Sequence, residues 1–277
     1  MKKTMTLILI SILAVVLLGY GAVSLFGDSE PTVATDGSVY YGTEKQTSEE
    51  TVSEFISDVF AETTAAVTEA PKVEDYEYAY AGFMPAYADM DKSEWNLILV
   101  NRDYILPDGY MPTLAPCITD DPDSLKLDYR VAPYYNEMYL AALDDGVELT
   151  PVSGYRSVER QTNNFENKIQ KYMNEGYGKT EATQMAATII LPPGTSEHNA
   201  GLAMDICSLY ESFENTDEFR WLMENGADYG FILRYPEDKQ DITKIIYEPW
   251  HWRYVGVEAA KEMKASGLCL EEYLGVA

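Results

Sequence analysis

The 277-residue sequence has 46 acidic and 20 basic residues, a formal net charge of -26, and a hydrophobic content of 46%. This apolar content allows a buried core, whereas the charge excludes a nucleic-acid-binding surface, which requires clustered Lys and Arg. The three cysteines, Cys117, Cys207 and Cys269, form no Cys-x-x-Cys pair and are too few for a disulfide framework. We expect three free thiols, and one disulfide with a spare thiol remains the alternative.

An uncharged run at residues 5–26 follows Lys2 and Lys3. At about 1.5 Å per residue, a helix of this length would cross a bilayer core. The run is long for a cleavable signal peptide and offers no good small-x-small cleavage site. The lysines before it and Asp28 after it place the amino terminus in the cytoplasm. Residues 1–27 are therefore predicted to form an uncleaved, single-pass anchor, with the rest of the chain outside the membrane.

Residues 28–92 contain fifteen acidic and three basic residues and are rich in Thr, Ser and Glu. Such a composition resists burial and predicts a flexible stalk. Within it, apolar residues at helical spacing predict a short amphipathic helix at 53–66. This helix either docks on the folded domain or self-associates. The alternative is a transient helix, because short isolated helices are marginal in water.

Residues 93–277 alternate between strand-like and helix-like patterns. Strands are predicted at 96–101, 147–152, 202–207, 231–234 and 245–254. Helices are predicted at 132–143, 157–174, 180–190 and from a Thr216 cap to Asn225, with a turn at 107–109. The pattern is typical of a mixed α+β domain.

The chain has only two histidines, His198 and His251, so any imidazole-based site must use them. His198 follows a turn-rich loop and precedes a predicted strand on which Gly201, Ala203 and Asp205 share one face. A carboxylate on the inner face of a strand is costly unless it is paired or binds a cation. A metal ion shared by His198 and Asp205 meets that requirement.

The second histidine lies in the segment 247–254, where aromatic residues alternate with His251 and Arg253. Two imidazoles and one carboxylate leave the fourth tetrahedral position to water, as in catalytic zinc sites. Glu248 is the natural base for that water, provided that Pro249 creates a bulge which turns its carboxylate toward the metal. The alternative role for Glu248 is to orient His251.

The motif Ser196-x-His198-x-x-Gly201-x-Ala203-x-Asp205, followed by Glu248-x-x-His251, resembles the zinc D-alanyl-D-alanine carboxypeptidases of the VanY group. The likeness runs from about Trp95 to the end of the chain and includes the segments 153–157, 229–236 and 270–274. It implies an α+β fold with a small, mostly antiparallel central sheet flanked by helices, shared with VanX dipeptidases and the Hedgehog amino-terminal domain. It also implies zinc on His198, Asp205 and His251, with Glu248 as base. Lys244 stands where many relatives have Gly.

The same resemblance assigns substrate contacts to Arg156, Gln161 and Ser196. A guanidinium suits a substrate carboxylate or a developing oxyanion. A structural ion pair for Arg156, and helix-face or loop-capping roles for Gln161 and Ser196, remain the alternatives. Arg234 and Arg253 are expected to be structural.

These observations together predict a zinc carboxypeptidase that removes the terminal D-Ala from peptidoglycan stem peptides outside the membrane. An L,D-carboxypeptidase acting on tetrapeptide stems and a non-catalytic, zinc-containing wall-binding module are the alternatives. The sequence contains neither Ser-x-x-Lys nor Gly-x-Ser-x-Gly, which argues against serine chemistry.

Overall fold

The computed structural model describes residues 32–33, 39–40, 76–90, 94–118 and 125–277. The chain divides into two units, 1–66 and 67–277. In the first unit the structure describes only strands β1 (Thr32–Val33) and β2 (Val39–Tyr40), which pair antiparallel. The predicted anchor and the predicted helix at 53–66 lie outside the described residues. Among the residues that are described, no helix is both long and apolar enough to cross a membrane.

A four-stranded sheet forms the centre of the second unit, and its strands follow the order β7-β8-β10-β9. Every neighbouring pair in it is antiparallel, in agreement with the mostly antiparallel sheet that the resemblance implies. The strands are β7 (Pro151–Ser153), β8 (Ala203–Ile206), β9 (Phe231–Leu233) and β10 (His251–Tyr254). Successive side chains of a strand point to opposite faces of the sheet, so each strand contributes residues to both faces.

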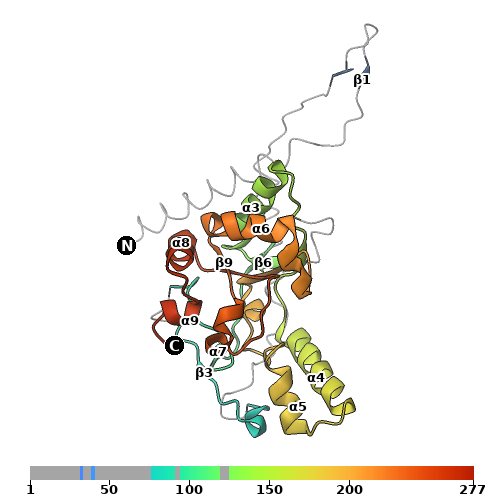
Figure 1. Ribbon diagram of the computed structural model, residues 1–277, viewed down its shortest axis with the longest axis vertical. Helices are drawn as coiled ribbons and strands as arrows, with labels where there is room; N and C mark the ends of the chain where they lie inside the picture. The colour runs from blue at the N-terminus through green and yellow to red at the C-terminus, as the bar shows by residue number, and fades with distance from the viewer. Residues whose placement is uncertain (1–31, 34–38, 41–75, 91–93, 119–124) are drawn as a thin grey trace. The chain divides into compact units, whose positions relative to one another are not determined.

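One face of this sheet belongs to the main hydrophobic core. Met204 and Ile206 of β8 and Trp252 and Tyr254 of β10 lie in a single buried cluster. Helices α3 (Ala132–Asp144) and α6 (Asp217–Asn225) contribute to the same cluster, and Figure 1 shows them on that side of the sheet. The predicted Thr216 cap is confirmed, because its hydroxyl accepts from the Phe219 amide at 3.2 Å. Packing of this face holds the sheet in place. The residues between the core residues of each strand point to the opposite face.

A helical hairpin of α4 (Val158–Asn174) and α5 (Lys179–Ala186) lies to one side of the sheet (Figure 1). A second hydrophobic cluster joins the hairpin to residues 76–83, which include the 3-10 turn η3 (Ala79–Ala81). Tyr78 is almost fully buried there and donates to Glu166 of α4 at 2.8 Å. The described residues between 76 and 90, assigned to the stalk from composition, therefore pack with the folded unit.

Shorter elements complete the second unit. Strand β3 (Ala86–Tyr87) pairs parallel with β4 (Tyr104–Ile105), and β5 (Leu114–Pro116) pairs antiparallel with β6 (Lys126–Asp128). The remaining helices and turns are η4 (Glu197–Ala200), η5 (Glu211–Asn215), η6 (Gly226–Tyr229), η7 (Glu237–Lys239), α7 (Gln240–Thr243), α8 (Val257–Ser266) and α9 (Leu270–Tyr273). All three cysteines are free.

The predicted strand at 96–101 is wrong, although residues 98–100 are buried as expected. The carbonyls of Asn96 and Ile98 accept hydrogen bonds from the Arg253 guanidinium, each at 2.9 Å. Their partner is thus a side chain and not the main chain of a neighbouring strand. The predicted strand at 245–254 begins only at His251, and the helix predicted at 180–190 ends at Ala186. Apolar runs thus identified buried segments correctly but not always their hydrogen bonding.

Candidate metal centre

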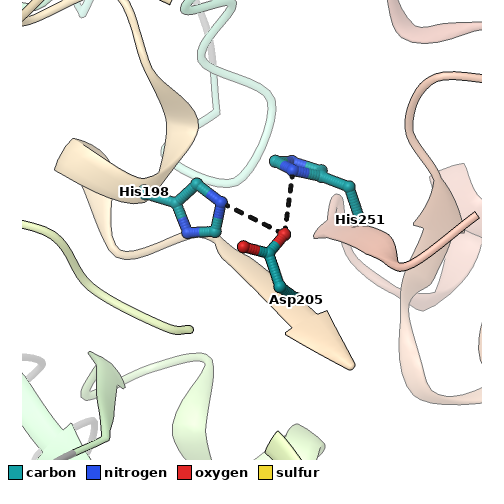
Figure 2. A group of neighbouring side chains, drawn as sticks. All are labelled: His198, Asp205 and His251. Carbon is teal, nitrogen blue, oxygen red and sulfur yellow. Dashed lines mark ion pairs between the residues drawn. The ribbon is translucent and has the colours of Figure 1, made fainter. Parts of the chain in front are cut away.

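Asp205 lies at the centre of the polar face of the sheet. The strand register places its Cα opposite both Ser153 of β7 and His251 of β10. His198 reaches the same carboxylate from η4, the turn that precedes β8 (Figure 2). The alternation predicted for the strand at 202–207 is confirmed, since Met204 and Ile206 enter the core while Asp205 faces the two imidazoles.

His198 is oriented by the main chain. Its Nδ1 lies 2.8 Å from the carbonyl oxygen of Gly154, so Nδ1 carries a proton and donates it. Nε2 then keeps a lone pair, and it points at Asp205 Oδ1 at 3.4 Å. Gly201 closes the turn with a φ of +68°, where an added Cβ would meet the Asp128 amide nitrogen at 2.8 Å. The glycine of the motif therefore allows the loop to reach the site.

His251 is oriented by a side chain instead. Its Nε2 lies 3.4 Å from Glu197 Oε2, and its Nδ1 lies 3.3 Å from Asp205 Oδ1. Only the Nε2 contact is a hydrogen bond, since Asp205 Oδ1 has no hydrogen-bond partner. Because a carboxylate can only accept, the proton of neutral His251 belongs on Nε2, which leaves the lone pair on Nδ1. Burial alone would lower the pKa of His251, but the nearby carboxylates of Asp205 and Glu197 raise that pKa to about 9.

These three residues fit a metal ion. One ligand atom from each of His198, Asp205 and His251 lies within 4.8 Å of the other two. Asp205 Oδ1 is buried and has no hydrogen-bond partner. Burial would raise the pKa of Asp205, yet the two imidazoles hold it well below its usual range. A buried, ionised oxygen that faces one ring nitrogen of each imidazole is well placed to share a cation with them, and two nitrogens with one oxygen suit zinc.

Glu248 lies beside this group. The His251 amide donates to the Glu248 carbonyl at 3.1 Å, closing a turn over Pro249 and Trp250. The predicted bulge is therefore a turn, which brings Glu248 Oε2 to 3.6 Å from His251 Nδ1. Burial raises the pKa of Glu248 to about 8, against the lowering effect of His251. A carboxyl whose pKa lies near neutrality is suited to proton transfer.

Arg156 reaches the same place from the loop after β7. Its Nη2 donates to Ser153 Oγ at 3.1 Å and lies 3.4 Å from Asp205 Oδ2, while Nη1 donates to Gln161 at 2.9 Å. The guanidinium is thus held at the site, and its buried Nε has no partner. Gln161 also donates to the Leu191 carbonyl at 2.5 Å, so Gln161 braces Arg156 from α4.

Ser196 caps η4, because its hydroxyl accepts from the His198 amide at 3.4 Å. Ser196, Gln161 and Arg156 all line a cavity of about 400 Å³ together with the metal group and Glu248. The cavity has apolar walls that the sequence did not single out: Val152, Ile189, Ile190, Leu191, Leu209, Tyr235, Ile245 and Trp250. The predicted site residues therefore all meet at one cavity.

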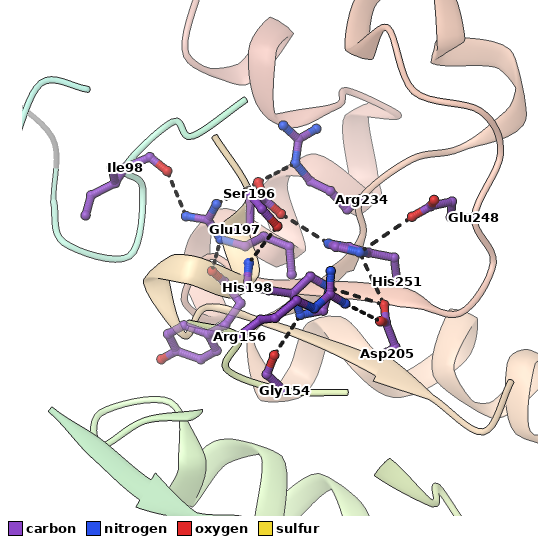
Figure 3. Close-up of polar contacts among 12 residues, drawn as sticks. Ile98, Gly154, Arg156, Ser196, Glu197, His198, Asp205, Arg234, Glu248 and His251 are labelled. Atoms are coloured by element: carbon purple, nitrogen blue, oxygen red, sulfur yellow. Dashed lines mark hydrogen bonds and ion pairs between the residues drawn. The ribbon is translucent and has the colours of Figure 1, made fainter. Parts of the chain in front are cut away.

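Glu197 is a site residue that sequence reasoning missed. It is fully buried, and its Oε1 accepts from Arg234 Nε at 2.6 Å and from Arg253 Nη1 at 2.7 Å (Figure 3). Burial would raise the pKa of Glu197, but the two arginines hold it well below its usual range. The signal in the sequence was two arginines in buried strand segments, which require a buried acid.

Three side chains that could hold a metal ion, an adjacent carboxylic acid and an open cavity are typical of one class, the metal-dependent hydrolases that activate water. Residues 124–257 match the model of the VanY family, described as D-alanyl-D-alanine carboxypeptidase. The chain is 43% identical to a D-alanyl-D-alanine carboxypeptidase of Enterococcus faecalis over 184 residues, 66% of this chain and 67% of the relative. The chain therefore belongs to the VanY family of zinc peptidases.

Solved structures agree with that assignment. VanYB in complex with D-alanine-D-alanine is 42% identical, with a TM-score of 0.58 over 66% of this chain and 98% of that one. A Glu-to-Ala variant of a VanY D,D-pentapeptidase, solved with Zn(II), is also 42% identical, with a TM-score of 0.57 over 65% and 99%. The LD-carboxypeptidase LdcB is 35% identical, with a TM-score of 0.57 over 69% and 95%.

Proposed function

We propose that this chain is a zinc-dependent D-alanyl-D-alanine carboxypeptidase that removes the terminal D-Ala from peptidoglycan stem peptides. In this proposal His198, Asp205 and His251 hold the zinc ion, and Glu248 is the catalytic base. The observation that carries it is Asp205 Oδ1, a buried oxygen without a hydrogen-bond partner that faces one ring nitrogen of each histidine. Glu248 lies beside them at the cavity.

A bound zinc ion would supply a Lewis acid for the scissile carbonyl and would make a water molecule more acidic. Glu248 accepts the proton of the attacking water and delivers it to the leaving D-Ala amine. Its burial supports this role, because a carboxyl with a raised pKa both accepts and returns a proton near neutral pH.

Arg156 is the group that meets the negative charge of the substrate. Its guanidinium is mostly buried, is held by Ser153 and Gln161, and lines the cavity beside Asp205. A planar guanidinium in that position binds either the terminal carboxylate or the oxyanion that develops during hydrolysis. Gln161 fixes the guanidinium, and Ser196 supports the loop that carries His198.

Defined stem peptides test the specificity. Release of D-Ala from a pentapeptide ending in D-Ala-D-Ala, abolished by a chelator and restored by zinc, is the expected result. Release from a tetrapeptide but never from the pentapeptide would replace the D,D assignment with L,D activity. Zinc binding without any hydrolysis would favour a wall-binding module.

We also propose that residues 1–27 anchor the chain in the membrane with the peptidase domain outside. The support is the uncharged run after Lys2 and Lys3, together with a substrate class that lies outside the membrane. Protease added to intact cells should degrade the domain, while the protein should fractionate with membranes. A protein recovered in the supernatant after cell lysis would contradict this location.

A further inference from the structure

The carboxylate of Glu197 divides its two oxygens between different partners. Oε1 accepts from Arg234 Nε at 2.6 Å and from Arg253 Nη1 at 2.7 Å. Oε2 lies 3.4 Å from His251 Nε2, at the long end of hydrogen-bond range. Figure 3 shows Glu197 between Arg234 and His251. The side chains of Glu197, Arg234 and Arg253 are all fully buried.

The arginines determine which oxygen is available to the histidine. A guanidinium has five donors and no acceptor, so Arg234 and Arg253 can only be met by an oxygen. With Oε1 held by both of them, Oε2 is left to accept the Nε2 proton of His251. The other ring nitrogen, Nδ1, is the one that faces Asp205.

The arrangement extends to the carboxy-terminal helix α9. Glu271 of α9 accepts from Arg234 Nη1 and Nη2 at 2.9 and 2.6 Å, and from Asn101 at 3.0 Å. Two acids thus balance the charges of two arginines in a buried group. In the described part of the chain, Glu271 has no hydrogen bond or ion pair with either histidine, so it shares the group without touching a proposed ligand.

We propose that Glu197 is a positioning residue that fixes the tautomer of His251. By accepting the Nε2 proton, Glu197 keeps Nδ1 free for zinc and fixes the ring at the angle at which Nδ1 meets Asp205. This inference rests on the proposed zinc site. It assigns opposite tautomers to the two ligands, because His198 donates from Nδ1 to the Gly154 carbonyl and offers Nε2.

The substitution Glu197→Gln tests the tautomer directly. Arg234 and Arg253 would retain the amide oxygen, since neither has an acceptor for an NH₂ group. The introduced NH₂ group must then face His251 Nε2 and donate to it. Neutral His251 would carry its proton on Nδ1, the wrong tautomer for the metal. Zinc affinity, measured by chelator competition, should fall roughly 10- to 100-fold, as for other partners of metal ligands.

Glu271→Gln is the matched control, because it makes the same change of charge and also contacts Arg234. Thermal unfolding of both variants measures the shared structural effect. We expect zinc affinity to stay within about threefold of the wild type for Glu271→Gln. An unchanged affinity in Glu197→Gln, or equal losses in both variants, would overturn the positioning role.

A second measurement needs no substitution. With only two histidines in the chain, ¹⁵N spectra of the zinc-loaded wild type can assign every ring nitrogen. We expect protonated Nε2 in His251 and protonated Nδ1 in His198. A protonated Nδ1 in His251 would refute the inference while leaving the zinc site intact. If the wild type bound no zinc at all, the proposed function itself would fail and this inference with it.

Discussion

The two histidines of the proposed metal centre are supported in different ways. His198 is held by the main chain, through the Gly154 carbonyl at 2.8 Å and through its own carbonyl, which accepts from the Arg156 amide at 3.0 Å. His251 is held by the side chain of Glu197. The half of the site around His198 thus depends on hydrogen bonds of main-chain groups. The half around His251 depends on particular side chains from distant segments.

Replacing Glu248, the proposed base in the His251 half, should have the largest effect. Glu248→Gln keeps the shape of the turn but removes the proton acceptor, so kcat should fall by about 10²–10⁴-fold. Zinc content, measured by metal analysis of the purified protein, should stay at the wild-type level. Undiminished hydrolysis would show that Glu248 only supports His251, the role that the sequence left open.

The next largest effect is expected for Arg156→Lys, in the His198 half. A lysine cannot reach Ser153 and Gln161 together as the guanidinium does, so kcat/KM should fall by about 10²–10³-fold. Steady-state kinetics then show which charge Arg156 binds. A higher KM at constant kcat indicates the terminal carboxylate, and a lower kcat indicates the oxyanion. Unchanged kinetics would leave Arg156 as a structural residue.

The pH dependence of zinc binding should reveal the side-chain support of His251. In the metal-free protein the pKa of His251 is about 9, so the ring is charged at neutral pH, whereas burial lowers the pKa of His198. Zinc must displace the His251 proton, and apparent affinity should rise about tenfold per pH unit from pH 6.5 to 8.5. Competition with a chelator of known pH dependence measures this slope, and a flat profile would contradict it.

The substitution Gly154→Ala tests the main-chain contact that orients His198, the hydrogen bond from its Nδ1 to the Gly154 carbonyl. The added Cβ would lie 2.5 Å from the Lys126 carbonyl oxygen and 3.3 Å from Met204 Cε. We expect a loss of about 1–3 kcal/mol in the free energy of unfolding, measured with urea, and weaker zinc binding as the loop shifts. Gly178→Ala is the control, since a Cβ there would meet nothing within 4 Å. Equal stability of both variants would mean that the loop containing Gly154 accommodates the added Cβ without strain.

The smallest effect is expected at Lys244, which precedes the Glu248 turn. Lys244 has a φ of +61°, a left-handed conformation that costs a lysine roughly 1–2 kcal/mol. Lys244→Gly removes that cost but adds freedom to the unfolded chain and loses a contact with the Asp241 carbonyl. The free energy of unfolding should rise by up to about 1 kcal/mol, with kcat unchanged. A destabilised variant would show that the side-chain contact outweighs the strain.

The sequence predicted the His198 half well because its logic is local. Strand alternation places Asp205 on the polar face, and the turn-rich loop delivers His198 to it. The Thr216 cap also follows a rule that acts within a few residues, whereas Gly201, expected on the strand, closes the turn before it. His251 followed from the presence of only two histidines and from strand alternation, whereas Glu248 rested mainly on the VanY resemblance, because simple alternation would turn its side chain away from the metal.

What the sequence did not reveal depends on contacts between distant segments. In the sequence, Glu197 is one polar residue in a loop, and nothing near it indicates its partners. Only the fold brings Arg234 and Arg253 to its Oε1. Tyr76 and Tyr78 lie in an acidic stretch that composition assigns to the stalk, yet they are buried against the α4–α5 hairpin. Periodicity cannot find such partners, because neither member of the pair has a local reason for its position.

The reach of these contacts also has a kinetic consequence. Arg253 hydrogen-bonds the carbonyl of Asn96, 157 positions earlier, and Asn101 bonds Glu271, 170 positions later. Contacts of such high sequence separation form slowly, because the chain loses the entropy of closing a long loop before the contact can stabilise it. We expect the Glu197 group to form late in folding, so that the capacity to bind zinc tightly appears only as the last segments join.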